Sequence, residues 1–433
     1  MIHENLSINN KGELCVAGVS TVDLAAKYGT PLYIMDENKI RENMRAYNEG
    51  IKEVLGCDDF LVIYASKACS FVRMAQIAKE EGIGLDSVSI GEVYTAKAAG
   101  FDLSRIFFHG NFKTDEDIEK AIEEGVGYFV ADCMEEIETI QYFAEKKGVK
   151  QKILIRLTPG INPDTFEAVN TGKIDSKFGF SMIGDNAEKV LLKTLSMPNI
   201  DLEGFHYHLG SQMFDSEPLV DGAKIILDFM VKMNQKHGYQ AKILDIGGGC
   251  AVRYTENDEK IDKKKWIMHA VSGVKKECER LGIKVPFIIT EPGRSIVADA
   301  GTTVYKVGCV KVIEGYKTYV AIDGGMSDNP RYALYKSPYT VMSANNADKE
   351  PSMKCSVVGR LCESGDIIQE DVYLPECKRG DMIAVLSTGA YNFSMSSNYN
   401  RVYRPAVVMV KDGSDYVAVN RQTTEDLLSG DVR

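Results

Sequence analysis

Eight short apolar runs, separated by longer segments with helical spacing, constrain the fold of this chain more than any other feature. Alternating strands and helices form βαβ units with a parallel sheet, and eight units close into a (β/α)8 barrel of about 250 residues. The interval from Asp36 to Glu291 has this length. The expected helices include Asp36–Leu55, Thr114–Glu124, Cys133–Lys147 and Pro218–His237. The expected strands are Phe60–Ala65, Ile83–Asp86, Arg105–His109, Gly127–Ala131, Lys152–Leu157, Leu202–His208, Lys242–Ile246 and Val285–Thr290.

The pattern changes after Glu291, where strand-like runs follow one another without long helices between them. Such a run of strands with Gly, Pro and Asn turns predicts a mostly antiparallel β-sandwich or barrel. We therefore expect a barrel domain over 36–291 and a β domain formed by 1–35 and 292–433, with strand Glu13–Val16 packing on it. Segment 338–353 is polar and irregular and predicts a loop. The expected strands are Thr302–Ile313, Thr318–Ile322, Lys354–Val358, Ile367–Tyr373, Met382–Leu386 and Arg401–Val410.

Charge and composition exclude several classes of protein. The net charge of −11 over 433 residues disfavours nucleic acid and anionic membranes as partners. No segment approaches the roughly 20 apolar residues of a membrane helix, and the polar N-terminus lacks the apolar region of a signal peptide. The ten cysteines contain no CxxC pair and no metal-ligand spacing. We expect a cytoplasmic chain with reduced thiols and no metal site.

Polar side chains and glycines follow almost every expected barrel strand. The active site of a (β/α)8 barrel lies at the carboxyl ends of its strands. A single lysine or histidine there is more often a solvated or satisfied side chain, but their coincidence at many strand ends indicates a site. They are Ser66-Lys67, Asp86, His109-Gly110-Asn111, Arg156, His206-Tyr207-His208, Ser211, Gly247-Gly248-Gly249 and Glu291-Pro292-Gly293-Arg294.

The glycine run 247–249 has two readings. A strand followed by glycines and a helix also begins a dinucleotide fold. However, Gly-Gly-Gly is not G-x-G-x-x-G, it follows the seventh strand rather than the first, and no ribose-binding acid follows at the usual spacing. We therefore favour a phosphate cradle of backbone N–H groups.

This set of groups suits one chemistry. Loss of carbon dioxide from an amino acid leaves a carbanion, which pyridoxal phosphate absorbs as an electron sink. That cofactor needs a lysine for its Schiff base, an acid beside its pyridine nitrogen, amides for its phosphate and a group against its ring. Lys67, Glu291, the glycine run and His208 offer these groups.

The same residues resemble the fold-type III, barrel-type decarboxylases that depend on pyridoxal phosphate. The resemblance covers nearly the whole chain, and its motifs occur here in order. Leu361, just before the Cys-Glu-Ser run, stands where members of the family vary. The motifs are Tyr64-Ala65-Ser66-Lys67-Ala68, His208-Leu209-Gly210-Ser211-Gln212, Gly247-Gly248-Gly249, Glu291-Pro292-Gly293-Arg294, Asp323-Gly324-Gly325-Met326, Cys362-Glu363-Ser364-Gly365-Asp366 and Gly389-Ala390-Tyr391.

The resemblance implies a role for each matching residue. Lys67 is the Schiff-base lysine, His208 stacks on the cofactor ring, and Glu291 pairs with the pyridine nitrogen. Cys362 is the expected proton donor to the decarboxylated carbon. The cofactor-binding set is completed by Asp86, Ser211, Gly247, Gly248, Gly249, Pro292, Gly293, Arg294 and Tyr391, and the substrate-binding set by Arg294, Arg331, Tyr335, Glu363 and Tyr391.

The distal residues predict a substrate charged at both ends. Arginines suit a far carboxylate and Glu363 suits a far ammonium, as in meso-2,6-diaminopimelate, whose decarboxylation gives L-lysine. Arg331 alone could also be a solvated arginine in a turn. Related decarboxylases that act on D-lysine, D-ornithine, L-ornithine, L-lysine, arginine or carboxynorspermidine remain the alternative.

The resemblance also implies a homodimer in which Cys362 and Glu363 reach the partner's site. The alternative from another functional class is a catalytically dead regulator that forms a dimer with a true decarboxylase. The presence of Lys67, Glu291 and Cys362 disfavours it, and the acid at Glu291 disfavours a racemase on the same barrel.

Overall fold

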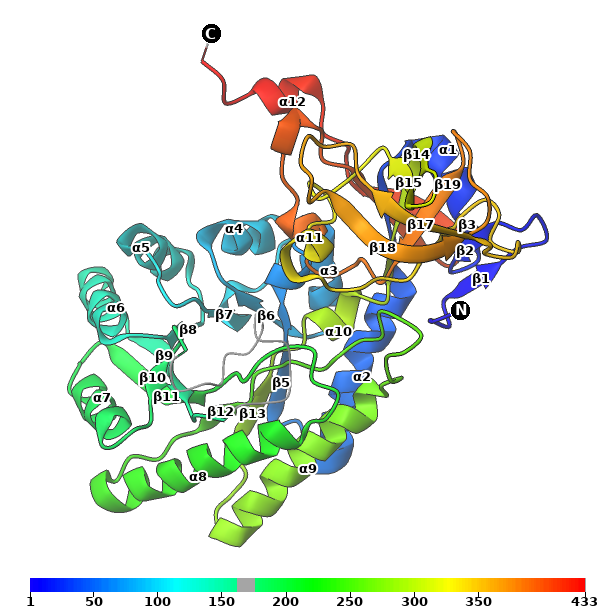
Figure 1. Ribbon diagram of the computed structural model, residues 1–433. Coiled ribbons are helices and arrows are strands. Elements are labelled where there is room, and N and C mark those ends of the chain that lie inside the picture. The colour runs from blue at the N-terminus through cyan, green and yellow to red at the C-terminus, as the bar shows by residue number, and fades with distance from the viewer. Residues whose placement is uncertain (162–175, 433) are drawn as a thin grey trace. The chain divides into compact units, whose positions relative to one another are not determined.

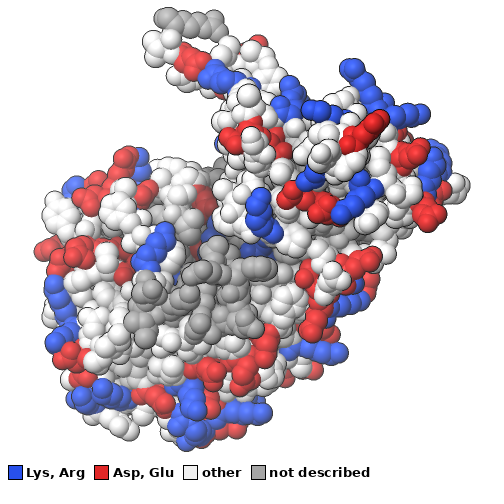
Figure 2. Space-filling view, viewed as in Figure 1, with Lys and Arg blue, Asp and Glu red and all other residues white. Residues whose placement is uncertain are grey.

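The computed structural model describes residues 1–161 and 176–432, which form two compact units. The barrel unit comprises Asn43–Ala251 and Ile261–Ser295, and the β unit comprises Met1–Glu42, Val252–Lys260 and Ile296–Arg433. Among the described residues, none of the helices combines the length and the apolarity that crossing a membrane requires. On the face shown in Figure 2, basic and acidic side chains are intermixed.

The barrel unit contains a closed parallel sheet of eight strands. Each strand of the ring pairs with the next one along the chain, including β8 with β9, and the last strand, β13, pairs with the first, β5, to close the ring. The short β10 (Phe180–Ser181) pairs only with β9. The predicted (β/α)8 barrel is therefore confirmed. The ring strands are β5 (Phe60–Ala65), β6 (Gly84–Ser87), β7 (Ile106–Phe108), β8 (Tyr128–Ala131), β9 (Gln151–Thr158), β11 (Ile200–His206), β12 (Ile243–Asp245) and β13 (Phe287–Thr290).

Helices cover the outer face of these strands, and α4 to α9 ring the barrel in Figure 1. Helix α5 begins with a capping box in which Thr114 and Asp117 satisfy each other's backbone N–H groups. Helices α5, α6, α8 and α9 each end before a glycine in the left-handed conformation, which glycine adopts without steric cost. The helices are α2 (Glu37–Leu55), α3 (Val72–Glu80), α4 (Ile90–Ala98), α5 (Asp115–Glu124), α6 (Met134–Lys147), α7 (Asn186–Leu195), α8 (Glu217–His237) and α9 (Lys263–Leu281).

The barrel interior is closed by one apolar side chain from each of six strands. These side chains alternate with residues that face the helices, as the twofold period of a strand requires. The interior of the barrel is therefore apolar, and the polar groups lie at the carboxyl ends of the strands. The six apolar side chains are Ile63, Phe107, Val130, Leu154, Ile243 and Ile289.

The β unit contains a sheet in which most neighbours run antiparallel. Strand β14 (Gly301–Ile313) is its longest and pairs antiparallel with β4 (Leu32–Asp36), β15 (Lys317–Ile322) and β19 (Met382–Leu386). The pairs of β4 with β20 (Ala406–Lys411) and of β15 with β17 (Met353–Val358) are parallel. Helix α10 (Arg294–Val297) begins in the barrel unit and continues into the β unit at Ile296. The other elements of the β unit are β1 (Leu6–Ile8), β2 (Leu14–Val16), β3 (Val19–Ser20), α1 (Thr21–Tyr28), α11 (Arg331–Tyr335), β16 (Val341–Ser343), β18 (Ile367–Leu374), β21 (Ser414–Val419) and α12 (Thr424–Leu428).

Two local expectations are wrong. Segment 338–353 is not all loop, because Val341–Ser343 forms β16 and pairs antiparallel with β19. The strand expected from Arg401 begins only at Ala406, because a 3-10 turn at Tyr399–Arg401 and a proline at position 405 precede it.

Candidate active site

The carboxyl ends of the barrel strands bring together the polar residues that the sequence placed there. Lys67 lies in a 3-10 turn directly after β5, Asp86 lies in β6 and His109 follows β7. His206 and Asp245 are the last residues of β11 and β12. Because these strands are parallel, all five side chains belong to the same end of the barrel, where catalytic residues of this fold lie.

The Lys67 ammonium is held by a buried carboxylate. Its Nζ atom donates to Oδ2 of Asp86 at 3.0 Å. The Asp86 side chain is fully buried, whereas 41% of the Lys67 side chain is exposed. The Ser66 hydroxyl donates to the backbone oxygen of Asp86 and fixes the turn. Lys67 is thus the accessible amine of an otherwise buried cluster.

Glu291 lies between two imidazoles. Its Oε1 is 2.9 Å from Nε2 of His109, and its Oε2 is 3.4 Å from Nε2 of His206. Burial by itself raises the pKa of Glu291, but its interactions with His109 and His206 outweigh burial and hold the pKa well below its usual range. Glu291 is therefore a carboxylate, although only 5% of the residue is exposed.

Two neighbours of Glu291, His206 and Asp245, are both uncharged. Burial lowers the pKa of His206 to about 4. Burial and the charge of Glu291 raise the pKa of Asp245 well above its usual range, so Asp245 is a neutral acid. Of these two neighbouring carboxyl groups, Glu291 is therefore the ionised one and Asp245 the neutral one.

The glycine run 247–249 allows the backbone to approach its neighbours closely. A Cβ atom on Gly248 would lie 2.2 Å from the backbone oxygen of Glu291, and Gly247 has φ of +67°. The Gly248 N–H donates to Nδ1 of His208 at 3.3 Å. Burial lowers the pKa of His208 well below its usual range, so its ring is neutral and presents an apolar face.

Arg294 and Ser211 lie together in the barrel unit. Nε of Arg294 donates to the Ser211 hydroxyl at 3.0 Å. Arg294 begins α10 immediately after Pro292 and Gly293, and only 6% of it is exposed. A buried guanidinium beside a hydroxyl is a suitable pair for a phosphate or carboxylate group.

The remaining predicted residues belong to the β unit. Arg331 and Tyr335 are the first and last residues of α11, and Cys362 and Glu363 lie in the exposed loop between β17 and β18. Tyr391 has a left-handed backbone with φ of 61°. Within the β unit, Arg331 is buried while Tyr335, Cys362 and Glu363 are exposed.

Within the described residues, the guanidinium of Arg331 lies beside aromatic rings rather than carboxylates. Its guanidinium carbon is 4.6 Å from the ring centre of Tyr254 and 5.4 Å from that of Tyr339. It donates to the Tyr339 hydroxyl at 2.8 Å and to the Ser337 hydroxyl at 2.9 Å. In the part of the chain that the structure describes, no carboxylate forms an ion pair with it.

Sequence reasoning assigned no role to His109, His206 or Asp245. The signal was available, because His109 and His206 were placed at strand ends with Lys67 and Glu291. Their contact with Glu291 joins residues more than 80 positions apart, however, and no local pattern predicts it.

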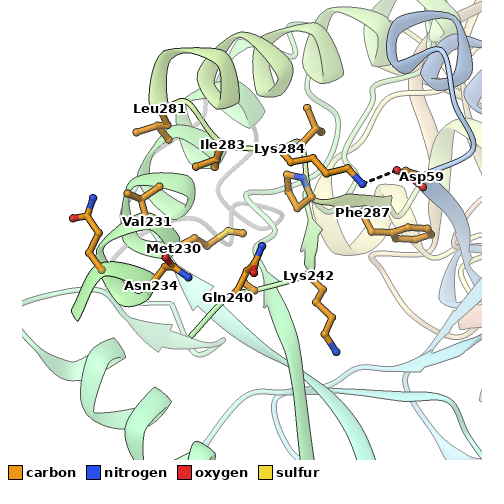
Figure 3. Close-up of a pocket in the computed structure, with 14 residues that line it drawn as sticks. Asp59, Met230, Val231, Asn234, Gln240, Lys242, Leu281, Ile283, Lys284 and Phe287 are labelled. Atoms are coloured by element: carbon orange, nitrogen blue, oxygen red, sulfur yellow. Dashed lines mark hydrogen bonds and ion pairs between the residues drawn. The ribbon is translucent and has the colours of Figure 1, made fainter. Parts of the chain in front are cut away.

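A cavity lies at the opposite end of the barrel strands from this cluster (Figure 3). It has a volume of about 550 Å³, and two of its lining residues, Lys284 and Asp59, form an ion pair at 3.3 Å. Lys242 and Phe287 line it just before and at the start of β12 and β13. Active sites of this fold lie at the opposite, carboxyl ends, so this cavity is not the candidate site.

Comparison with known proteins identifies the class to which this site belongs. Residues 37–298 match the family model described as "Pyridoxal-dependent decarboxylase, pyridoxal binding domain". The chain is 42% identical to a diaminopimelate decarboxylase of Bacillus subtilis (strain 168), with 100% of this chain and 98% of that protein covered. It is also 42% identical to a diaminopimelate decarboxylase of Staphylococcus aureus (strain COL), over 98% and 99% of the two chains.

A solved structure agrees with the sequence relatives. The diaminopimelate decarboxylase of M. jannaschii in complex with L-lysine superposes with a TM-score of 0.92 at 30% identity, covering 99% of this chain and 98% of that one. The chain therefore belongs to the pyridoxal-dependent decarboxylase family, within its group of diaminopimelate decarboxylases.

The cofactor of this family is pyridoxal phosphate, and the residues present fit it. A Cβ atom on Gly249 would meet Cε of Met213 at 2.3 Å and the backbone oxygen of Gly210 at 2.5 Å, so only glycine leaves the cradle its shape. Lys67 supplies an accessible amine, and Glu291 supplies a buried carboxylate. The donor set thus matches an aldehyde, a phosphate and a ring nitrogen.

Proposed function

We propose that this chain decarboxylates meso-2,6-diaminopimelate to L-lysine and carbon dioxide with pyridoxal phosphate as its cofactor. The names of its relatives and the L-lysine in the M. jannaschii structure support this substrate. The expected substrate has an amino acid group at each end. One end must react, and the other must be recognised by groups of the opposite charge.

The buried guanidinium of Arg331 is the observation that carries the proposal. It is desolvated, its orientation is fixed by Tyr339 and Ser337, and among the described residues its charge faces aromatic rings rather than a carboxylate. A buried cation of this kind suits a bidentate pair with a carboxylate. A substrate without a far carboxylate forgoes that pair, at a cost of about 1–3 kcal/mol.

The barrel residues then have distinct tasks. When bound, pyridoxal phosphate supplies the electron sink that accepts the pair left by departing carbon dioxide. Lys67 anchors the cofactor through its Nζ atom, and Glu291 holds a proton at the ring nitrogen. The glycine run, Ser211 and Arg294 bind the phosphate, with Asp86, Pro292, Gly293 and Tyr391 completing the set, and His208 lies against the ring.

The loop between β17 and β18 completes the chemistry. The Sγ atom of Cys362 gives a proton to the substrate carbon, and Glu363 binds the far ammonium. Arg331, Arg294 and Tyr335 bind the far carboxylate. We further propose that the chain is a homodimer in which this loop serves the partner's site.

We also propose a cytoplasmic location, which the free thiols of all ten cysteines favour.

One assay tests the substrate. Carbon dioxide release is measured with meso-diaminopimelate, L-lysine, D-lysine and L-ornithine under the same conditions. We expect kcat/KM for meso-diaminopimelate to exceed each of the others by more than about tenfold, or 1.4 kcal/mol. A preference for L-ornithine or a lysine isomer would establish the related basic amino-acid decarboxylases instead. No release of carbon dioxide from any of the four substrates would support the alternative that the chain is a catalytically dead regulator of a true decarboxylase.

A further inference from the structure

The carboxylate of Asp366 ties the loop that bears Cys362 to a second loop of the β unit. Its Oδ2 accepts the Leu361 N–H at 2.8 Å, and its Oδ1 accepts the Met326 N–H at 2.6 Å. Only 3% of Asp366 is exposed. The Arg360 N–H also donates to the backbone oxygen of Gly324 at 3.0 Å, so the two loops are joined at two places.

Two glycines make room for this carboxylate. A Cβ atom on Gly325 would lie 2.5 Å from Oδ1 of Asp366, and one on Gly359 would lie 2.1 Å from Oδ2. Any larger residue at either position would displace the carboxylate from the N–H groups that it accepts. Asp366 thus occupies a space that both loops leave for it.

Asn400 fixes the next peptide of the same loop. Its Oδ1 accepts the Cys362 N–H at 2.7 Å. Asn400 has φ of 51° and ψ of 22°, a left-handed conformation that asparagine tolerates better than most residues. Its segment is held in turn, because the Ser397 N–H donates to the backbone oxygen of Ser327 at 2.8 Å.

We propose that Asp366 and Asn400 are positioning residues that hold the Leu361 and Cys362 peptides and so aim the Cys362 thiol. Two successive N–H groups are each bound by a side-chain oxygen, the Leu361 N–H by Asp366 of the same loop and the Cys362 N–H by Asn400 of a distant segment. With both peptides fixed, the thiol of an exposed loop keeps only its own side-chain rotation. This inference rests on the proposed function, because that function makes Cys362 a proton donor.

A pair of variants at position 400 separates positioning from folding. Asn400→Gly keeps the left-handed backbone and removes only the acceptor, whereas Asn400→Asp keeps an acceptor oxygen. Asp412→Gly is the matched control, because Asp412 is also exposed and left-handed, with φ of 50°, in the turn between β20 and β21. The holoenzyme is used throughout, and its cofactor absorbance checks that the site stays loaded.

Two readouts follow the loop. The first is the rate at which iodoacetamide alkylates Cys362, followed by mass spectrometry of the peptide so that the other cysteines do not interfere. The second is kcat and KM for meso-diaminopimelate. Loss of one hydrogen bond should make alkylation about fivefold faster and lower kcat about fivefold in Asn400→Gly. Asn400→Asp should stay within about twofold of wild type, as should Asp412→Gly.

The outcomes distinguish this inference from the function on which it rests. Equal alkylation rates in Asn400→Gly and wild type would overturn the positioning role, whatever the activity. Faster alkylation with an unchanged kcat, together with full activity in Cys362→Ala, would retain the positioning of the loop and reject Cys362 as the proton donor. A loss of kcat in Asp412→Gly equal to that in Asn400→Gly would assign the effect to general loosening and overturn the inference.

Discussion

The Nε2 atom of His109 lies 2.9 Å from Oε1 of Glu291, and both side chains are buried at the carboxyl end of the barrel. Together with the contact from His206, this contact keeps the pKa of Glu291 well below its usual range despite burial. A permanently ionised carboxylate is what a pyridine nitrogen needs if it is to stay protonated.

Glu291→Gln should therefore bind the cofactor but turn over slowly. The amide preserves the shape of the side chain and removes its charge, so the electron sink becomes weaker. We expect kcat to fall by more than about tenfold, or 1.4 kcal/mol of transition-state stabilisation. Steady-state assays check this, with cofactor absorbance as the control for binding. A kcat within about twofold of wild type, under 0.5 kcal/mol, would show that Glu291 does not have this role.

Lys67 should carry the cofactor. The purified protein is expected to be yellow, with an absorption band that borohydride abolishes. Mass spectrometry should then place the stable adduct on Lys67, because its Nζ is the accessible amine beside Asp86. The Lys67→Arg variant keeps the charge and is the control. An adduct on any other lysine, or no band after cofactor is added, would reject this assignment.

Arg331 should determine which substrate is accepted. Arg331→Lys keeps a positive charge but loses the planar fork that pairs with a carboxylate. We expect kcat/KM for meso-diaminopimelate to fall by more than about tenfold and cofactor affinity to stay unchanged. Glu363→Ala tests the other charge of the same substrate end, with the same two measurements. If neither variant changes kcat/KM, the distal pocket lies elsewhere.

The strands and the site of the barrel could be predicted because both depend on local sequence. The segment Phe60–Ala65 was expected as a strand and is β5. Three expected helices end, as predicted, at the residue before Gly125, Gly148 and Gly238, each of which has a left-handed backbone. Strand β4 was not expected. Leu32–Asp36 is short, and it is a strand because it pairs with β14 and β20, which lie hundreds of residues away.

The missed parts of the site have the same physical cause. His109 and Glu291, or Asp366 and Met326, are partners only after the chain has folded. A motif such as Cys-Glu-Ser-Gly-Asp shows which residues lie in one loop, but it does not show that the carboxylate at its end binds a neighbouring loop. Resemblance supplied roles for Cys362 and Glu363, whereas the contacts of Asp366 and Asn400 required coordinates.

The stability of the chain should depend on the ionisation of Asp328. Burial raises the pKa of Asp328 to about 7 from an ordinary 3.8. Its pKa is higher in the folded state than in the unfolded state, so the folded state binds this proton more tightly. The stability that this group contributes is complete below about pH 4 and is lost as the pH rises through about 7.

Asp328→Asn removes this titration and nearly preserves the shape of the side chain. Urea unfolding at pH 5, 6, 7 and 8 measures the free energy of unfolding of both proteins. Relative to the variant, wild type should lose about 3 kcal/mol between pH 5 and pH 8. Taking the difference cancels the other titrating groups, which the two proteins share. Parallel curves for the two proteins would contradict a raised pKa at Asp328.

Each active site should be shared between two subunits. Lys67 belongs to the barrel unit, whereas Cys362 lies in an exposed loop of the β unit. In a twofold dimer with shared sites, a Lys67→Ala subunit still offers a good thiol and a Cys362→Ala subunit still offers a good lysine. Each variant alone should be nearly inactive. Refolded together in equal amounts, about half the dimers are mixed with one intact site each, so about a quarter of wild-type activity should return.

A second mixture gives the opposite signal and excludes incomplete mixing as an explanation. Wild type is refolded with an equal amount of the double variant Lys67→Ala/Cys362→Ala. With shared sites, a mixed dimer has no complete site, and activity falls to about a quarter of that of an equal total amount of wild type. If each subunit is self-contained, a mixed dimer keeps one site and activity is about half. Native mass spectrometry verifies the mixed dimers in both experiments. No recovery in the first mixture and one half in the second would place Lys67 and Cys362 in the same subunit's site, because only that arrangement keeps both groups together in every wild-type chain.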